Sequence, residues 1–424
     1  MKGAPLSTSA AFLDFDSDGW LDLFVGRYMD YGISTDRGCL IRGMSQQDIN
    51  MMQREGEARG VPKADLACGP HEMKTTASRL YRNNGNGTFT DLTATSGIGS
   101  ANGHALAIAI ADFNEDGRPD IYVASDGYPS LLFMNRGDGT FKEDAARAGV
   151  AVWRNGAAFA GMGADTADYD GDGHYDLITA NYEKEPLTLY RGRGDGTFID
   201  MAEQSGLSTP GFPFLKWGVR LLDFNGDGRR DVFVANGHVD PAGTPGRPLN
   251  MPDEKWPGKG FAQEALVLAG TAEGRFIDMS AQSGQFFRDK HVARGAAFGD
   301  YDNDGDWDVF IVNIDEPAVL LRNDSPAYRW GRLELEGAGC NRDALGSRVQ
   351  VTSGGLTQTE YVRSGGSYLS DHDHRLLFAL PGSAPATAEI HWPCGAVQTV
   401  TLTPGKTQHV TEVGCRLPAR KAPR

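Results

Sequence analysis

The sequence lacks several features that define common functional classes. No stretch approaches 18 consecutive apolar residues, so we expect no membrane-spanning helix. Basic residues are outnumbered, with 41 Lys and Arg against 56 Asp and Glu and a net charge of −15. Because phosphate backbones are bound by basic surfaces, we expect no nucleic-acid partner.

Catalytic signatures are missing as well. The sequence contains no Gly-x-Ser-x-Gly elbow, Walker loop, dinucleotide-binding fingerprint or His-Glu-x-x-His pair. Five histidines deserve a structural check: His104, His238, His291, His372 and His374. The first three either meet in a central channel or pack locally, and local packing is the preferred interpretation. The last two chelate a transition metal only if their segment bends, so an exposed turn at 371–375 is preferred.

Cysteine is scarce, with five residues in the chain. Cys39 and Cys68 lie in one long interruption of the repeat pattern described below, and a disulfide between them is favoured over two free thiols. Cys340, Cys394 and Cys415 leave one thiol over. A Cys394–Cys415 bridge is plausible, but spacing alone does not fix the connectivity. Disulfides would place the protein in an oxidising compartment.

Glycine, in contrast, is abundant. It accounts for 55 of 424 residues, or about 13% against an average near 7%, which is typical of a chain that turns often. Many of these glycines belong to one acidic motif, D-[FY]-[DN]-x-D-G-x-x-D, which recurs with spacings of 98, 56, 55 and 77. Its five copies begin at Asp14, Asp112, Asp168, Asp223 and Asp300.

The spacing within the motif predicts a calcium site. Oxygens at positions 1, 3 and 5 converge when the loop coils, glycine at position 6 permits the turn, position 7 offers its carbonyl, and Asp at position 9 closes the shell. Such a set suits Ca²⁺ better than Mg²⁺, which demands stricter octahedral geometry. We therefore predict about five Ca²⁺ sites. The candidate ligands are Asp14, Asp16, Asp18, Trp20, Asp22, Asp112, Asn114, Asp116, Arg118, Asp120, Asp168, Asp170, Asp172, His174, Asp176, Asp223, Asn225, Asp227, Arg229, Asp231, Asp300, Asp302, Asp304, Asp306 and Asp308.

The flanks of the motif exclude an EF-hand, which needs helices and a glutamate at position 12. Here the motif leads into β-branched and aromatic runs at 23–25, 121–123 and 232–234, which indicate strands. A second element, strand-turn-strand with Gly-Asp-Gly or Gly-Asn-Gly at the turn, recurs at 80–89 and 132–141 and twice more further on. Together they give four short strands in about 55 residues, the content of a propeller blade.

These blades resemble the FG-GAP/VCBS calcium-loop propeller repeats. Residues 14–324 are similar to the propeller of the cartilage acidic protein family and its bacterial members, which share the elements at 234–240 and 68–70. The fold class expected is therefore all-β, with a β-propeller of calcium-loop blades and a small C-terminal β domain. Five blades are visible, and the chain is expected to be truncated from seven, with further blades and a secretion signal upstream.

We expect a propeller at 1–326, with insertions at 28–78 and 240–261, then a β domain at 330–415 and a frayed basic tail at 416–424. Within the β domain, runs at 341–349, 363–370 and 391–393 resemble the ASPIC/UnbV domain. The family follows its propeller with this domain at the same place.

The resemblance implies an exported protein, extracellular or periplasmic. It favours a secreted calcium-binding module for interaction or adhesion, with a protein or glycan ligand on a propeller face. The insertion at 240–261 is either part of that binding rim or a solvated connector. The alternative function is a carbohydrate-active enzyme, or an enzyme or accessory protein of natural-product biosynthesis. That alternative rests on analogy of fold and family rather than on a site.

Overall fold

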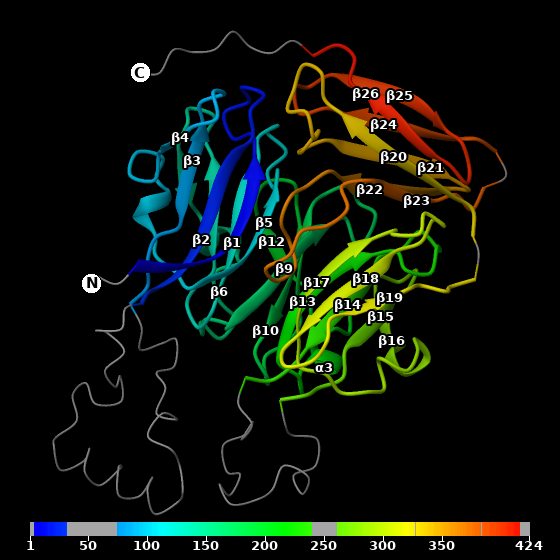
Figure 1. The fold of residues 1–424 in the computed structure, drawn as a ribbon, viewed down its shortest axis with the longest axis horizontal. Helices are drawn as coiled ribbons and strands as arrows, with labels where there is room; N and C mark the ends of the chain where they lie inside the picture. The colour runs from blue at the N-terminus through cyan, green and yellow to red at the C-terminus, as the bar shows by residue number, and fades with distance from the viewer. Residues whose placement is uncertain (1–3, 32–73, 240–260, 327, 383, 416–424) are drawn as a thin grey trace, which may run out of the picture.

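The computed structural model describes residues 4–31, 74–239, 261–326, 328–382 and 384–415 (Figure 1). The predicted all-β fold is confirmed. Five antiparallel sheets follow one another along residues 4–321, and each is a meander in which neighbouring strands are consecutive in sequence. Both large insertions fall almost entirely outside the described residues, as do Cys39, Cys68 and the tail from 416.

Each of the first five sheets is one blade, numbered here in chain order. Blade 1 contains β1 (Ala4–Leu13), β2 (Asp22–Tyr31), β3 (Arg79–Asn83) and β4 (Phe89–Asp91). Blade 2 contains β5 (Ala105–Ala111), β6 (Asp120–Ser125), β7 (Leu131–Asn135) and β8 (Phe141–Glu143). Blade 3 contains β9 (Gly161–Ala167), β10 (Asp176–Asn181), β11 (Thr188–Gly192) and β12 (Phe198–Asp200). Blade 4 contains β13 (Lys216–Leu222), β14 (Asp231–Asn236), β15 (Leu266–Gly270) and β16 (Phe276–Asp278), and blade 5 contains β17 (Ala293–Gly299), β18 (Asp308–Asn313) and β19 (Val319–Leu321).

The first strand of each blade is innermost and contacts the first strand of the next, from β1 through β5, β9 and β13 to β17. Every residue of β5, β9 and β13 is buried. The crowding there explains the small residues: a Cβ on Gly163 would lie 2.0 Å from the Trp217 carbonyl oxygen. Each pair of neighbouring blades shares an apolar core, such as Phe24 of blade 1 against Phe133 of blade 2, with ring centroids 6.3 Å apart.

The five blades form an arc whose two end sheets keep apolar side chains in solvent. On blade 5, Phe310, Val312 and Leu320 are each 45–48% exposed, on the side of the sheet away from blade 4. On blade 1, Leu6 and Phe12 are similarly exposed. The expectation of seven blades stays a prediction.

A C-terminal sandwich of two sheets follows the blades, shown in gold to red in Figure 1. One sheet has the order β23-β20-β26 and the other β22-β21-β24-β25. A shared core that includes Leu333, Phe378 and Ile390 fills the space between them. The strands are β20 (Trp330–Glu336), β21 (Arg348–Ser353), β22 (Leu356–Tyr361), β23 (Leu376–Ala379), β24 (Ala386–His391), β25 (Val397–Leu402) and β26 (Thr407–Thr411).

The connection between β22 and β23 leaves this sandwich and runs along the innermost strands of the blades. Ser367 and Ala164 of β9 exchange two backbone hydrogen bonds, of 2.6 and 3.2 Å. Further on, the Asp373 amide donates to the Phe298 carbonyl of β17 at 2.9 Å. The interpretation of 371–375 as an exposed turn is therefore wrong for His372, whose ring packs against Phe298.

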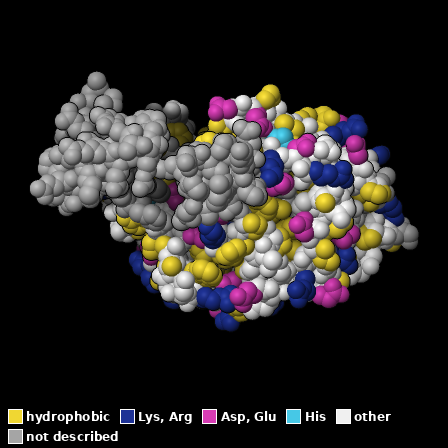
Figure 2. Space-filling model, turned by 90° about the horizontal axis from the view of Figure 1, so that it is seen from below, with side chains coloured by type: hydrophobic (Ala, Val, Ile, Leu, Met, Phe, Trp, Pro, Cys, Tyr) yellow, Lys and Arg dark blue, Asp and Glu magenta, His cyan; other side chains and the backbone are white. Residues whose placement is uncertain are grey.

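Charged side chains are dispersed on the described part of the surface. On the face seen in Figure 2, Lys and Arg side chains alternate with Asp and Glu, with apolar side chains between them. In the described residues, no helix is long and apolar enough to cross a membrane. Short helical turns in the described part of the chain connect the blades: η4 (Ile98–Ser100), α2 (Ala145–Ala148), α3 (Ser208–Gly211) and η6 (Ser280–Gln282).

Candidate metal centre

The five acidic motifs occupy equivalent places, each joining the first strand of its blade to the second. We call them loop 1 (14–22), loop 2 (112–120), loop 3 (168–176), loop 4 (223–231) and loop 5 (300–308). The glycine at position 6 has a positive φ in every loop, between 81° and 100°, a conformation that residues with a Cβ rarely adopt. These glycines are Gly19, Gly117, Gly173, Gly228 and Gly305.

The carboxylate at position 1 closes each loop on itself. In loop 1, Asp14 Oδ1 accepts the Asp18 amide and Oδ2 accepts the Gly19 amide, both at 3.0 Å. In every loop the second oxygen accepts the position-6 amide, and the first accepts an amide at position 4 or 5. The other four carboxylates are those of Asp112, Asp168, Asp223 and Asp300.

Position 9 has a role that the motif analysis missed, because its second partner is distant in sequence. In loop 2, Asp120 accepts the Phe113 amide at 3.1 Å and, from the end of β7, the Asn135 amide at 2.7 Å. The same pair of bonds recurs in the other four loops. Their acceptors are Asp22, Asp176, Asp231 and Asp308. Since each carboxylate oxygen has more than one lone pair, these bonds leave capacity for a cation.

Three of the loops gather carboxylates from three residues, with oxygen atoms within 4.8 Å of one another. The three clusters are Asp14 with Asp16 and Asp18, Asp168 with Asp170 and Asp176, and Asp300 with Asp302 and Asp304. Loops 2 and 4 have the neutral Asn114 and Asn225 at position 3 instead. These acidic clusters could hold metal ions, and their donors are all oxygens, the ligands that Ca²⁺ and Mg²⁺ take.

Burial makes the carboxylates at positions 1 and 9 of the loops poor anions on their own. Burial raises the pKa of Asp14 to about 7, and the charges of Asp16 and Asp18 add to that rise. Burial likewise raises the pKa of Asp22 and of Asp120 to about 8, although each accepts two backbone hydrogen bonds that oppose the shift. A bound cation would stabilise the charged form of such groups and reverse the shift.

The position-7 amide donates to the position-5 carboxylate, as in Trp20 to Asp18 and Arg229 to Asp227, both at 2.9 Å. Position 7 is also where the motif requires a backbone carbonyl oxygen as a metal ligand. That role stays a prediction for the residues at this position, which are Trp20, Arg118, His174, Arg229 and Asp306. Basic side chains already offset some loop charge. Arg191, for example, pairs with Asp170 at 2.7 Å and with Asp172 at 2.9 Å.

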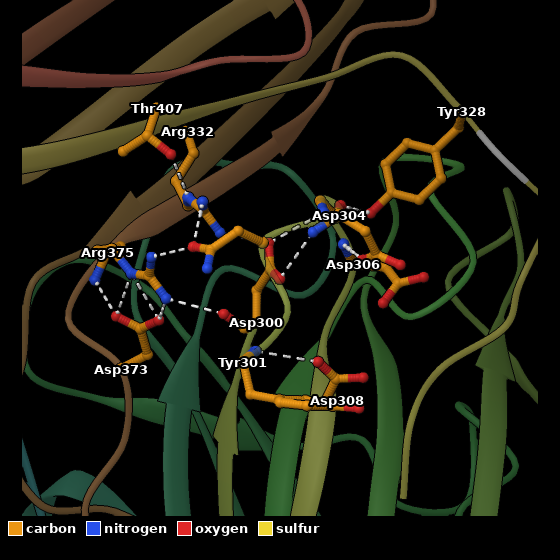
Figure 3. A network of polar contacts seen from close by, with 12 residues as sticks. Asp300, Tyr301, Asp304, Asp306, Asp308, Tyr328, Arg332, Asp373, Arg375 and Thr407 are labelled. Carbon is orange, nitrogen blue, oxygen red and sulfur yellow. Dashed lines mark hydrogen bonds and ion pairs between the residues drawn. The ribbon is translucent and has the colours of Figure 1, made fainter.

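The loops also carry the contact with the C-terminal sandwich, as Figure 3 shows for loop 5. Arg332 of β20 forms an ion pair with Asp300 and donates to Asn303 Oδ1 at 2.9 Å. Arg375 donates to the Asp300 carbonyl, also at 2.9 Å. In loop 3, the Gly173 carbonyl lies 3.3 Å from the hydroxyl of Tyr361. The predicted cation sites therefore face the second part of the protein.

The histidines near the blades make local contacts, as the preferred interpretation has it. His104 Nδ1 lies 3.2 Å from the Asp126 carbonyl, and its ring packs between Tyr28 and Tyr128. His238 lies 3.5 Å from a Glu183 carboxylate oxygen. His291 Nδ1 lies 3.0 Å from Glu316. Among the described residues, no potential metal cluster includes a histidine.

The structure gives the cysteine pairing that the sequence left open in the C-terminal part. Cys394 and Cys415 form a disulfide with Cα atoms 5.8 Å apart, which is consistent with an oxidising compartment. Cys340 keeps a free thiol. Burial, with the nearby Glu412 charge, raises the pKa of that thiol to about 12. The thiol is therefore not a ready nucleophile.

Comparison with known families matches both parts of the chain. The model described as FG-GAP-like repeat matches residues 63–123, 112–179 and 168–234. The model described as ASPIC and UnbV matches residues 337–414. This chain is an FG-GAP-like repeat protein with an ASPIC and UnbV domain. The resemblance seen in the loop and hairpin motifs is thereby confirmed.

The chain is distantly similar in sequence to cartilage acidic protein 1. It is 25% identical to the Xenopus tropicalis protein over 415 residues, which cover 94% of this chain and 58% of that one. It is 24% identical to the Homo sapiens protein over 347 residues, which cover 73% of this chain and 47% of that one. The chain thus spans about half the length of these relatives.

Solved structures are only remotely similar. The rhamnogalacturonan lyase of Bacillus licheniformis shares 14% identity with a TM-score of 0.31, over 98% of this chain and 76% of that one. An Agrocybe aegerita lectin shares 19% identity with a TM-score of 0.28, over 59% of this chain and 75% of that one. Scores this low carry no argument about function.

Proposed function

We propose that the five loops bind Ca²⁺ as structural ions, and that the protein is a calcium-stabilised interaction module. The observation that supports this best is the repeated hydrogen-bond scheme. In all five loops, the carboxylates at positions 1 and 9 hold the backbone in one coil. A scheme repeated five times, at the same end of every blade, fits a common ligand better than five unrelated turns.

The charge balance supports the same proposal. The loops concentrate buried carboxylates in a chain whose net charge is already −15. Five Ca²⁺ ions would bring that charge to about −5. Their positive charge would also stabilise carboxylates that burial has removed from water. The candidate ligands are those given by motif positions 1, 3, 5, 7 and 9. Mg²⁺ would hold its waters more tightly and fit these coiled loops less well.

Structural calcium would act at two interfaces. Position 9 fixes the loop to the third strand of its own blade, and the loop face carries the C-terminal sandwich through contacts such as Arg332 with Asp300. A rigid loop face would therefore hold blades and sandwich in one arrangement. We propose that this scaffold presents a propeller face to a protein or glycan ligand.

The proposed setting is extracellular or periplasmic. The Cys394–Cys415 disulfide fits such a compartment. Extracellular calcium modules commonly have dissociation constants of about 10⁻⁴–10⁻³ M, which cytosolic calcium would not saturate.

Thermal unfolding tests the proposal. Stripping the protein with EDTA is expected to lower the melting temperature, because an ion that binds only the folded state stabilises it by mass action. Adding 2 mM free Ca²⁺, about twice the weakest dissociation constant expected for such modules, should restore the melting temperature, and equimolar Mg²⁺ should restore less of it. An identical melting curve with and without EDTA would contradict structural calcium.

A further inference from the structure

A cavity of about 680 Å³ lies where loops 1 and 2 meet the C-terminal sandwich. It is distinct from the interior of the loops, because side chains of β21 and of the segments after β22 and β24 form much of its wall. The polar and aromatic residues that matter here are Arg348, Arg363, Tyr175, Tyr361 and Trp392. Two predicted calcium ligands, Asp14 and Asp112, also line it, but the calcium proposal gives these arginine and aromatic side chains no role.

Arg348 enters the cavity without a counter-ion. It begins β21, pairs in register with Tyr361 and His391, and directs its guanidinium toward Gly173, where Nη2 would lie 3.1 Å from an added Cβ. Its Nε is buried and has no hydrogen-bond partner. Within the described residues, Arg348 forms no ion pair. The side chain is half-buried, and its buried Nε is costly unless an acceptor reaches it.

Arg363 is a second arginine in the cavity wall. Its side chain is only 7% exposed, and its Nη2 lies 3.3 Å from Asp165 Oδ1. Arg220 uses that same oxygen, at 3.2 Å, so one carboxylate serves two guanidinium groups. The Nε atoms of both arginines lack partners. Burial, together with the charge of Arg363, lowers the pKa of Arg220 to about 10.

Arg230 and Glu360 form an ion pair with each other. Both cavity arginines lie close to Tyr175. Burial, with the charges of Asp112 and Glu115, raises the pKa of its hydroxyl, and the charges of Arg363 and Arg348 oppose that rise. Arg348, Arg363 and Tyr175 thus all line the same cavity.

An aromatic surface lies beside the arginines. The rings of Tyr175 and Tyr361 stack with centroids 3.6 Å apart, and Trp392 lines the same cavity. Aromatic surface next to paired guanidinium groups suits an organic anion, since the ring faces bind its body while the arginine forks bind its charge.

We propose that this cavity binds a small anionic ligand, whose carboxylate or phosphate group pairs with Arg348 and Arg363 and whose body packs on the aromatic wall. The site does not depend on the calcium proposal, because the arginines and not the loop carboxylates hold the anion. Asp14, Asp112 and Glu115 also line the cavity, so the anionic group would have to lie against the arginines and away from these carboxylates.

Isothermal titration calorimetry of the metal-stripped full chain tests this site. The probes are D-glucuronate, inorganic phosphate and, as a neutral control, D-glucose. We expect saturable binding of at least one anion and none of glucose. Arg348→Gln should weaken that binding at least about tenfold, Arg348→Lys should weaken it less, and the exposed Arg193→Gln should leave it unchanged.

The melting temperature of each variant, measured in parallel, separates loss of binding from loss of fold. Arg348→Lys keeps the charge and so serves if Arg348→Gln unfolds. Binding of glucuronate alone would identify a carboxylate ligand, and binding of phosphate alone would identify a phosphate ligand. The proposal is overturned if neither anion binds the wild-type chain, or if a folded Arg348→Gln variant binds as tightly as the wild type.

Discussion

Asp120 offers the sharpest test of the loop architecture. Its side chain is fully buried, and its two oxygens each accept a backbone amide, one from Phe113 in the loop and one from Asn135 at the end of β7. Asp120→Ala would leave both donors buried without acceptors. At about 1–3 kcal/mol for each unsatisfied group, the expected loss is about 2–6 kcal/mol in free energy of unfolding.

Asp120→Asn is the matched variant. Its side-chain carbonyl still accepts one amide, whereas its NH₂ group faces the other, so the expected loss is about 1–3 kcal/mol. Asp343→Ala, at an exposed turn in the C-terminal sandwich, should stay within about 0.5 kcal/mol of wild type.

Urea unfolding of metal-stripped protein, followed by circular dichroism, measures these losses apart from any contribution of calcium. The order Ala, then Asn, then control supports the two-amide role of position 9. A cost below about 1 kcal/mol for Asp120→Ala would refute it, since two buried amides would then have lost their acceptor without penalty.

Three further predictions concern an ion pair, the buried loop carboxylates and the disulfide. Arg332→Gln should lower the unfolding free energy by about 3 kcal/mol, since it leaves the buried Asp300 unpaired; a value near zero in urea unfolding would contradict the ion pair. In calcium-free buffer, stability should fall as pH rises from about 4 to 8, because folded-state pKa values near 7 and 8, as at Asp14 and Asp22, exceed the unfolded value, so the folded state holds more protons. Saturating calcium should abolish that trend. A melting temperature that rises steadily between pH 5 and 8 in the presence of chelator would contradict the raised pKa values of these loop carboxylates. Cys394→Ser should cost about 3 kcal/mol, as expected for a disulfide that closes a 21-residue separation, and a melting temperature insensitive to it would argue against the bridge.

Most of the fold could be predicted from local sequence patterns. The acidic motif and the glycine hairpin each repeat within a blade, so strand order and the positive φ at position 6 followed from short-range chemistry. Family comparison then confirmed both the repeats and the C-terminal domain. The three loops that gather carboxylates from three residues are those with Asp rather than Asn at position 3.

Contacts between distant parts of the chain could not be read this way. The second amide held by Asp120 comes from Asn135, in a different strand, and no periodicity links the two. The path of 363–375 along the innermost strands joins Ser367 to Ala164 across some two hundred residues. For the same reason His372 reads as part of a polar turn although its ring is packed inside. The pairing of Arg332 with Asp300 likewise depends on how two units dock.

The central claim is that each acidic loop is one cation site. Calcium stoichiometry, measured by calorimetry on the metal-stripped chain, tests it most directly. The account predicts about five Ca²⁺ per chain, and one fewer for Asp168→Ala, which removes the position-1 carboxylate of loop 3 alone. A wild-type chain that takes up no calcium at millimolar concentration, or an Asp168→Ala variant that binds as many ions as wild type, would contradict it.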